Sequence, residues 1–215
     1  MKYLSLFSGI GGFELGIAQA HESLCNVDRG ENRGGKKNQA GTQGQGLFTK
    51  TGENARSSKR STCPSVADIV DEGSLCIGYS EIDKYAIQTY QKNFPNHHNY
   101  GDITKINENE LPDFDCLVGG FPCQTFSIAG KRKGFEDTRG TMFFEIARIL
   151  RAKQPRLFVL ENVKGLLSHD NGNTFRTIIA TLDELGYDLQ WQVLNSKNHG
   201  VPQNRERVFI IGHLS

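Results

Sequence analysis

Residues 2–18, KYLSLFSGIGGFELGIA, decide the fold of this 215-residue chain. The apolar run from Lys2 to Phe7 is typical of a buried strand, and the glycines of Ser8 to Gly12 end it. Apolar residues at helical spacing follow. A strand, a glycine turn and a helix in this order let a ligand approach the backbone at the helix N-terminus. A dinucleotide fingerprint would need a glycine where the sequence has Glu14, which disfavours a nicotinamide-dependent dehydrogenase.

A polar segment interrupts this pattern. The acidic residue that faces a cofactor ribose is expected about 20 residues after the glycine turn, yet the first good candidate is Glu81. The residues between them are mostly small, polar or basic, and Ser23-Leu24-Cys25 recurs as Ser74-Leu75-Cys76. Such a composition buries too little surface to offset the entropy of ordering. We therefore predict one domain, residues 1–215, interrupted by a disordered insertion at about residues 26–76. The basic residues of the insertion could touch DNA, but a solvated loop is the favoured interpretation.

Composition narrows the class of protein. The chain has 25 basic and 24 acidic side chains, so net charge gives no indication of nucleic-acid binding. No apolar run approaches the length of about 18 residues that a membrane helix needs, and the N-terminus has no charged leader. We therefore expect a cytoplasmic protein. Five cysteines without a CxxC pair argue against a disulfide framework and against a zinc site, so no metal is expected.

The rest of the chain alternates strands and helices. Helical spacing predicts helices at Lys84 to Phe94, Thr141 to Leu150 and Thr174 to Leu185. Seven segments are predicted as strands: 2–7, 77–81, 100–103, 116–118, 157–160, 189–194 and 207–212, of which 100–103 is a short strand end with a carboxylate. This alternation implies a doubly wound α/β sheet. Ligands bind at the carboxyl ends of its strands, where the sequence places Glu81, Asp102, Cys123 and Glu161.

A second glycine turn, Gly119-Gly120-Phe121-Pro122-Cys123-Gln124, presents a cysteine. A single cysteine is more often a small buried hydrophobe than a reactive group. Here two glycines allow close backbone approach to a ligand, a proline stiffens the turn, and a polar, basic stretch follows. The pattern therefore favours an exposed nucleophile at Cys123.

Four segments match the motifs of one known family in type, order and spacing: Phe7 to Phe13, Gly119 to Gln124, Glu161 to Val163 and Gln203 to Arg207. In these segments the chain resembles the DNA (cytosine-5)-methyltransferases of the bacterial restriction-modification type. The resemblance covers residues 1–20 and 77–215. It implies the Rossmann-like sheet of S-adenosylmethionine-dependent methyltransferases, mostly parallel with one antiparallel strand, which we place at Arg207 to Gly212. It also implies S-adenosyl-L-methionine as the cofactor and double-stranded DNA as the partner.

The resemblance assigns a cofactor role to residues on four loops. Glu81 is expected to bind the ribose hydroxyls and Ile82 to contact the adenine, where many members of the family have a larger aromatic side chain. Asp102 and Ile103 are expected at the adenine edge, and Gly120 and Pro122 near the methyl donor. The first glycine turn is expected to hold the cofactor through Phe7, Gly9, Ile10 and Gly12.

The resemblance also assigns the catalytic residues. Cys123 is expected to attack cytosine C6, Glu161 to contact the N3 and amino group, and Arg205 and Arg207 to lie near O2. Two alternatives remain at this stage: Glu161 could cap a helix, and the two arginines could form surface ion pairs with Glu206 and its neighbours. The loop that follows the cysteine resembles a mobile DNA-binding loop, with Gln124, Ser127, Lys131, Arg132, Lys133 and Arg139 as expected contacts.

Members of the family continue into a target recognition domain and a C-terminal helix that completes the cofactor pocket. The sequence stops at Ser215, before either of them. We therefore expect a truncated or split enzyme that acts on nucleoid DNA together with a complementing C-terminal chain. The alternative is an inactive remnant or a regulatory module that binds DNA or cofactor.

Overall fold

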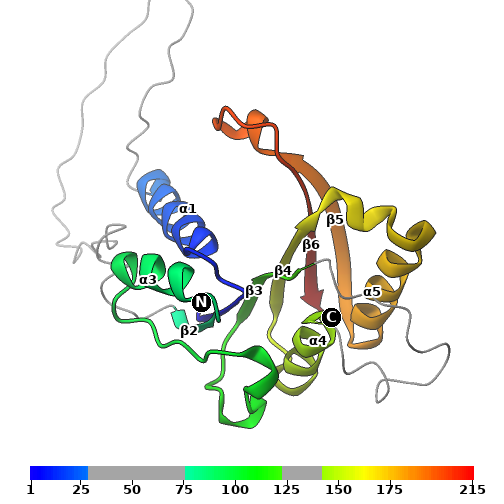
Figure 1. Ribbon diagram of the computed structural model, residues 1–215, viewed down its shortest axis with the longest axis horizontal. Coiled ribbons are helices and arrows are strands. Elements are labelled where there is room, and N and C mark those ends of the chain that lie inside the picture. Colours follow the sequence, from blue (N-terminus) through cyan, green and yellow to red (C-terminus); the bar gives the residue numbers. More distant parts are fainter. Residues whose placement is uncertain (29–75, 123–141) are drawn as a thin grey trace, which may run out of the picture.

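The computed structural model describes residues 1–28, 76–122 and 142–215 (Figure 1). Most of the predicted insertion lies outside the described residues, as does the loop that begins at Cys123. The strands are β1 (Tyr3–Leu6), β2 (Cys76–Ser80), β3 (Cys116–Gly120), β4 (Leu157–Val163), β5 (Tyr187–Asn195) and β6 (Glu206–Leu214). The α-helices are α1 (Gly12–Asp28), α3 (Lys84–Asn93), α4 (Met142–Lys153) and α5 (Asn173–Glu184). Short 3-10 helices are η1 (Ile103–Lys105), η2 (Glu108–Glu110), η4 (Lys164–Leu167), η5 (His169–Gly172) and η6 (Ser196–His199).

The strands of the described residues form one six-stranded sheet in the order β2-β1-β3-β4-β6-β5. Strands β1 to β4 are parallel, whereas β6 runs antiparallel to both of its neighbours. Helices α1 and α3 cover one face of the sheet, and α4 and α5 cover the other (Figure 1). The predicted doubly wound α/β fold is therefore confirmed, and so is the position of its antiparallel strand.

The carboxyl ends of the parallel strands lie at one edge of the sheet. The glycine turn follows β1 there, Glu81 follows β2 and Phe121 follows β3, while Glu161 lies near the end of β4. The hairpin between β5 and β6 projects beyond the same edge (Figure 1). The sheet thus gathers most of the predicted site residues along one side of the molecule.

The predicted strand at residues 100–103 is wrong. In this part of the chain only Asn99, just before the predicted strand, pairs with β2, through an isolated bridge to Tyr79. Gly101 then takes a positive φ of 72°, and Asp102 caps η1 through a hydrogen bond from Thr104 N to its side chain. A left-handed residue followed by a capped turn ends strand pairing, because the backbone can no longer stay extended.

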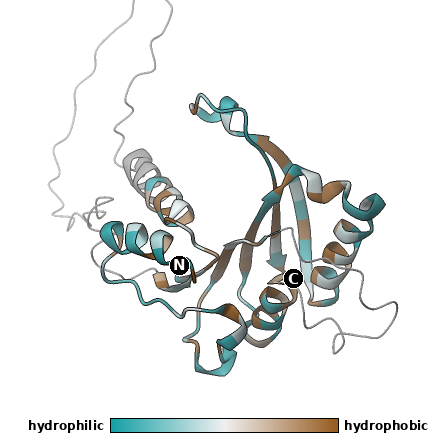
Figure 2. Cartoon of the chain, viewed as in Figure 1, coloured by the Kyte–Doolittle hydropathy of each residue, from teal (hydrophilic) through white to brown (hydrophobic). Residues whose placement is uncertain are grey.

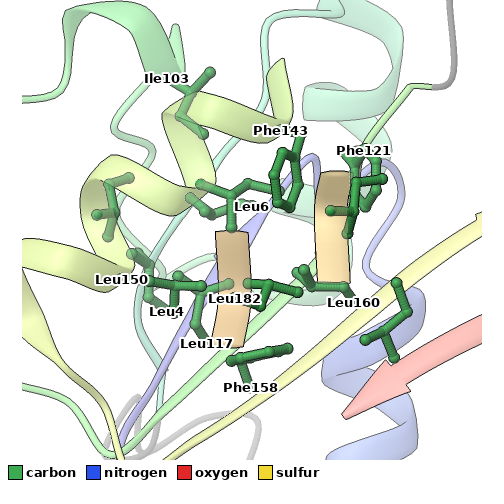
Figure 3. Packing of buried hydrophobic residues seen from close by; sticks show 14 of the residues in the cluster. Leu4, Leu6, Ile103, Leu117, Phe121, Phe143, Leu150, Phe158, Leu160 and Leu182 are labelled. Carbon is green, nitrogen blue, oxygen red and sulfur yellow. The ribbon is translucent and has the colours of Figure 1, made fainter. Parts of the chain in front are cut away.

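The main core lies between the sheet and helices α4 and α5. Leu4, Leu117 and Leu160 from three adjacent strands pack with Leu150 of α4 and Leu182 of α5 (Figure 3). In Figure 2 the hydrophobic colour gathers on the central strands and on α4, whereas α3 is mostly hydrophilic. Among the described residues, no helix is long and apolar enough to cross a membrane.

Candidate functional site

The glycine turn after β1 is held in a left-handed backbone conformation. Gly9 and Gly11 have φ angles of 55° and 95°, and Phe7, which is not a glycine, has a φ of 54°. A left-handed backbone costs a residue with a side chain about 1–2 kcal/mol, and such residues cluster at functional sites. Gly11 is also required for packing, since a Cβ atom there would lie 2.4 Å from Cε2 of Phe94. The turn therefore has one specific shape.

Glu81 is hydrogen-bonded to this turn. Its Oε2 accepts from the backbone N–H of Gly9 at 2.9 Å, and its Oε1 accepts from the N–H groups of Ile82 and Asp83 at 2.8 and 2.9 Å. Ile10 follows Gly9 in the chain and Ile82 follows Glu81, and they are 63% and 73% exposed. The Gly9–Glu81 hydrogen bond thus joins the turn that carries Ile10 to the end of β2, where Glu81 and Ile82 lie. A carboxylate can bind a sugar, and an exposed apolar side chain can contact a flat base.

Asp102 and Ile103 lie on the segment after α3. The side chain of Asp102 accepts hydrogen bonds from the hydroxyl and the backbone N–H of Thr104 at 2.8 and 3.0 Å. These bonds lower the pKa of the Asp102 carboxyl group. Ile103 is only 3% exposed, its side chain packs in the main core, and its carbonyl oxygen accepts a hydrogen bond from Arg148 at 3.0 Å. The Ile103 side chain therefore presents no surface to a ligand in this structure.

The loop after β3 starts from a tightly packed position. A Cβ atom at Gly119 would lie 3.1 Å from the carbonyl oxygen of Leu6, and one at Gly120 would lie 3.1 Å from Oε2 of Glu161. Phe121 is buried, whereas Pro122 is exposed. The predicted nucleophile Cys123 lies outside the described residues, as do the predicted DNA contacts Gln124, Ser127, Lys131, Arg132, Lys133 and Arg139.

Two of the predicted catalytic side chains form an ion pair. Nε of Arg207 lies 2.7 Å from Oε1 of Glu161, and both side chains are partly buried. The Glu206 carboxylate pairs instead with Lys164 at 3.0 Å, so it is not the ion-pair partner of Arg207. Glu161 lies inside β4, so the helix-capping alternative is wrong. Arg205 lies just before β6 and is exposed.

Asn162 also lies at this site, although its sequence motif predicted no role for it. The side chain is 2% exposed, and its Nδ2 donates to the carbonyl oxygen of Phe121 at 2.8 Å. Its Oδ1 accepts from the backbone N–H of Val163 at 2.8 Å. Asn162 therefore ties the loop after β3 to the strand that carries Glu161. The available signal was a second polar residue, next to Glu161, inside a mostly apolar strand, because a buried amide needs partners.

A buried polar cluster lies beneath the glycine turn. The hydroxyl of Tyr90 donates to Oε1 of Glu14 at 3.0 Å and lies 2.9 Å from Nδ1 of His97. Glu14 is 1% exposed. Burial raises the pKa of the Glu14 carboxyl group and lowers the pKa of the His97 imidazole. Both shifts favour the neutral forms. The glutamate that excludes a dinucleotide fingerprint is thus a buried support of the turn.

Replacing Glu14 with Gln should change how stability depends on pH. Above the ordinary glutamate pKa of about 4.3, the unfolded chain releases a proton that the folded Glu14 retains. Its contribution to stability therefore falls as pH rises. The opposite shift of His97 is common to both proteins. The free energy of unfolding of Glu14→Gln, measured with urea from pH 5 to 8, should thus rise relative to the wild type as pH increases. A constant difference across this range would contradict the shift.

Comparison with known proteins identifies related sequences. Residues 69–215 match the family model described as C-5 cytosine-specific DNA methylase. The chain is 59% identical over 133 residues to the type II methyltransferase M1.ScrFI of Lactococcus lactis subsp. cremoris. This alignment covers 62% of this chain and 34% of that protein. It is 53% identical over 146 residues to the type II methyltransferase M.NlaIV of Neisseria lactamica. This alignment covers 65% of this chain and 34% of that protein. The chain thus spans about a third of the length of these relatives.

Solved structures share the fold of this chain. A putative DNA modification methyltransferase encoded within a prophage of E. coli aligns with a TM-score of 0.60 and 22% identity, covering 100% of this chain and 47% of that one. A DNMT2 mutant of Spodoptera frugiperda aligns with a TM-score of 0.58 and 21% identity, covering 99% of this chain and 50% of that one. At these identities the comparison establishes the fold.

Proposed function

Because the chain belongs to the C-5 cytosine-specific DNA methylase family, we propose that it methylates C5 of cytosine in double-stranded DNA. The Glu161–Arg207 ion pair is the observation that supports this proposal most directly. It joins two of the family's motifs at the carboxyl edge of the sheet, and Glu161 also lies against Gly120, which leads into the loop of Cys123. A carboxylate and a guanidinium side by side can contact neighbouring polar atoms of one base.

The methyl donor of this family is S-adenosyl-L-methionine, and the residues around the first glycine turn fit it. A Cβ atom at Gly9 or Gly12 would meet no heavy atom within 4 Å, so open space adjoins the turn. The exposed side chains of Ile10 and Ile82 suit an adenine, and Glu81 suits ribose hydroxyls. We assign the cofactor to Phe7, Gly9, Ile10, Gly12, Glu81, Ile82, Asp102, Ile103, Gly120 and Pro122.

The proposed reaction uses Cys123 as the nucleophile. Its thiolate forms a bond to cytosine C6, and the electron pair of the C5–C6 double bond becomes available at C5. Glu161 at N3, with Arg205 and Arg207 near O2, stabilises the charge that develops on the ring. The cofactor, when bound, would supply an electrophilic methyl group to C5, and the electron pair of the sulfur–methyl bond that breaks would remain on the cofactor's sulfur as the leaving group. A base then removes the C5 proton, the C5–C6 double bond forms again and the thiolate leaves.

Duplex DNA requires one further step. Because C5 and C6 are stacked inside the helix, the target nucleotide must turn out, at a cost of a few kcal/mol. We assign the loop of Gln124, Ser127, Lys131, Arg132, Lys133 and Arg139 to the DNA backbone, since cations meet phosphates without reading sequence.

We assign the chain to the catalytic domain, interrupted by an insertion at about residues 26–76. Since it spans about a third of its relatives, we propose activity for this domain together with a target recognition domain, for which a complementing C-terminal chain is one source. In this proposal the enzyme acts in the cytoplasm on nucleoid DNA.

Trapping with 5-fluorocytosine tests the proposal. A base can remove a proton from C5 but cannot remove a fluorine, so the cysteine adduct on duplex DNA should persist. The reaction is run with cofactor and with a chain that supplies the target recognition domain. Peptide mapping should locate the adduct at Cys123, and Cys123→Ser should abolish it.

The control for trapping is Cys116→Ala. Burial raises the pKa of Cys116 to about 12, so this thiol is a poor nucleophile and its removal should leave the adduct in place. Absence of any adduct with the wild-type protein under these conditions would refute the enzymatic proposal.

A further inference from the structure

The side chain of Asn99 makes three hydrogen bonds at the outer edge of the sheet. Its Oδ1 accepts from the backbone N–H groups of Glu81 and Gly101 at 3.3 and 2.9 Å. Its Nδ2 donates to the carbonyl oxygen of Glu81 at 3.2 Å. The amide therefore engages both backbone groups of Glu81 and the N–H of Gly101.

These bonds determine the orientation of the Asn99 amide. The oxygen faces two N–H donors and the nitrogen faces one carbonyl oxygen. The flipped orientation would place an NH₂ group against two N–H groups and an oxygen against a carbonyl oxygen, losing all three bonds. The half-buried amide thus has one satisfied arrangement.

The Asn99 side chain continues the pairing of β2 beyond Tyr79, the last residue of β2 whose backbone is bonded to this segment. Strand β2 lies at the end of the strand order, and the backbone of its Tyr79 is bonded to His98 and Tyr100 at 2.8 and 2.7 Å. At Glu81 the Asn99 side chain takes the place of a neighbouring strand. The backbone groups of Glu81 are therefore held although β2 has ended.

The two residues that Asn99 joins lead directly to two carboxylates of the proposed cofactor pocket. Glu81 is itself bonded through Oε2 to Gly9 N in the glycine turn, at 2.9 Å. Gly101 precedes Asp102, and its carbonyl oxygen accepts from the hydroxyl of Ser80 at 2.6 Å. One amide thus spans the groups assigned to the ribose and to the adenine edge.

We propose that Asn99 is a positioning residue of the cofactor pocket, which holds Glu81 and the Gly101–Asp102 segment at a set separation. This inference rests on the proposed function, because it assigns Glu81 and Asp102 to the cofactor. Asn99 acts through their backbones and makes no contact with the cofactor itself. A ligand that bridges both carboxylates binds more tightly when the bound spacing already exists in the free protein.

The test is a double-mutant cycle on the affinity for S-adenosylmethionine, measured by calorimetry with the full chain. Asn99→Ala should weaken binding about tenfold, the effect expected when a set of positioning hydrogen bonds is lost. In a Glu81→Ala background the same change should weaken binding by about twofold or less, since the separation of two carboxylates no longer matters when one of them is missing. Asn107→Ala, an exposed asparagine whose bonds go to Asn109 and Glu110, should leave the affinity unchanged.

Two further measurements keep the inference falsifiable. Asn99→Gln retains an amide but displaces it by one methylene, and it should also weaken binding if placement is what matters. Hydrogen exchange without cofactor should speed up at the Glu81 and Gly101 amides of Asn99→Ala and stay unchanged at Leu117 in the core.

The outcomes separate the inference from the function on which it rests. Equal losses of affinity in both backgrounds, or full affinity in Asn99→Gln, would overturn the positioning role. A wild-type chain that binds no S-adenosylmethionine even together with a chain that supplies the target recognition domain and the C-terminal helix would count against the proposed function, and exchange at Glu81 and Gly101 would then decide whether Asn99 holds the two segments. Unchanged exchange would overturn the inference in that case.

Discussion

Glu161→Gln should lower kcat for DNA methylation about 100- to 1,000-fold, the range seen when one group that stabilises developing charge is removed. Glutamine keeps the size of the side chain and an oxygen for Arg207, whose Nε lies 2.7 Å from Glu161 Oε1. It loses the negative charge that complements Arg207 and the carboxyl group that is assigned to N3 of the cytosine. The KM for S-adenosylmethionine should stay within about twofold, because that loss falls on the chemical step.

Glu206→Gln is the matched control for this prediction. Glu206 is also paired with a cation, but the Lys164–Glu206 pair is exposed, and such pairs contribute about 0–1 kcal/mol. Methyl transfer from labelled cofactor, with a chain supplying the target recognition domain, should be near the wild-type rate in Glu206→Gln. Similar rates for the two variants would remove Glu161 from the catalytic residues.

Gly11→Ala should reduce the free energy of unfolding by about 3 kcal/mol, combining left-handed strain with overpacking. The φ of Gly11 is 95°, and the added Cβ would lie 2.4 Å from Phe94 and 3.4 Å from Tyr90. Relief of this clash must move the turn or the aromatic rings beneath it. S-adenosylmethionine affinity should therefore fall together with stability.

Gly16→Ala makes the same chemical change a few residues further along the chain. Gly16 lies in α1, and a Cβ atom there would meet nothing within 4 Å. Alanine is the better helix former by about 1 kcal/mol, so this variant should be as stable as the wild type or more stable. Urea unfolding of the two variants side by side is the measurement. Equal stabilities would show that the shape of the glycine turn is not constrained.

Local sequence patterns were sufficient for most of the fold. The sheet has an apolar run at each of its strands, and the helices begin or end near the predicted residues, as at Phe94 after α3. The prediction of a strand at 100–103 was wrong because the residue types of this segment do not reveal that Gly101 has a positive φ. The roles assigned to Cys123 and to its loop remain predictions, since those residues lie outside the described ranges.

By itself, the sequence determined the residue types of the site and the strand ends that carry them, because glycines, apolar spacing and the four motifs are local features. Tertiary structure alone decided which side chains meet. Glu161 pairs with Arg207 because β6 runs antiparallel beside β4, and Asn162 reaches Phe121 because β3 and β4 are adjacent. Asn99 reaches Glu81 because its segment bridges the outer edge of β2. Such contacts depend on strand order and register, which arise from the packing of the whole sheet and leave no mark in any short stretch of sequence.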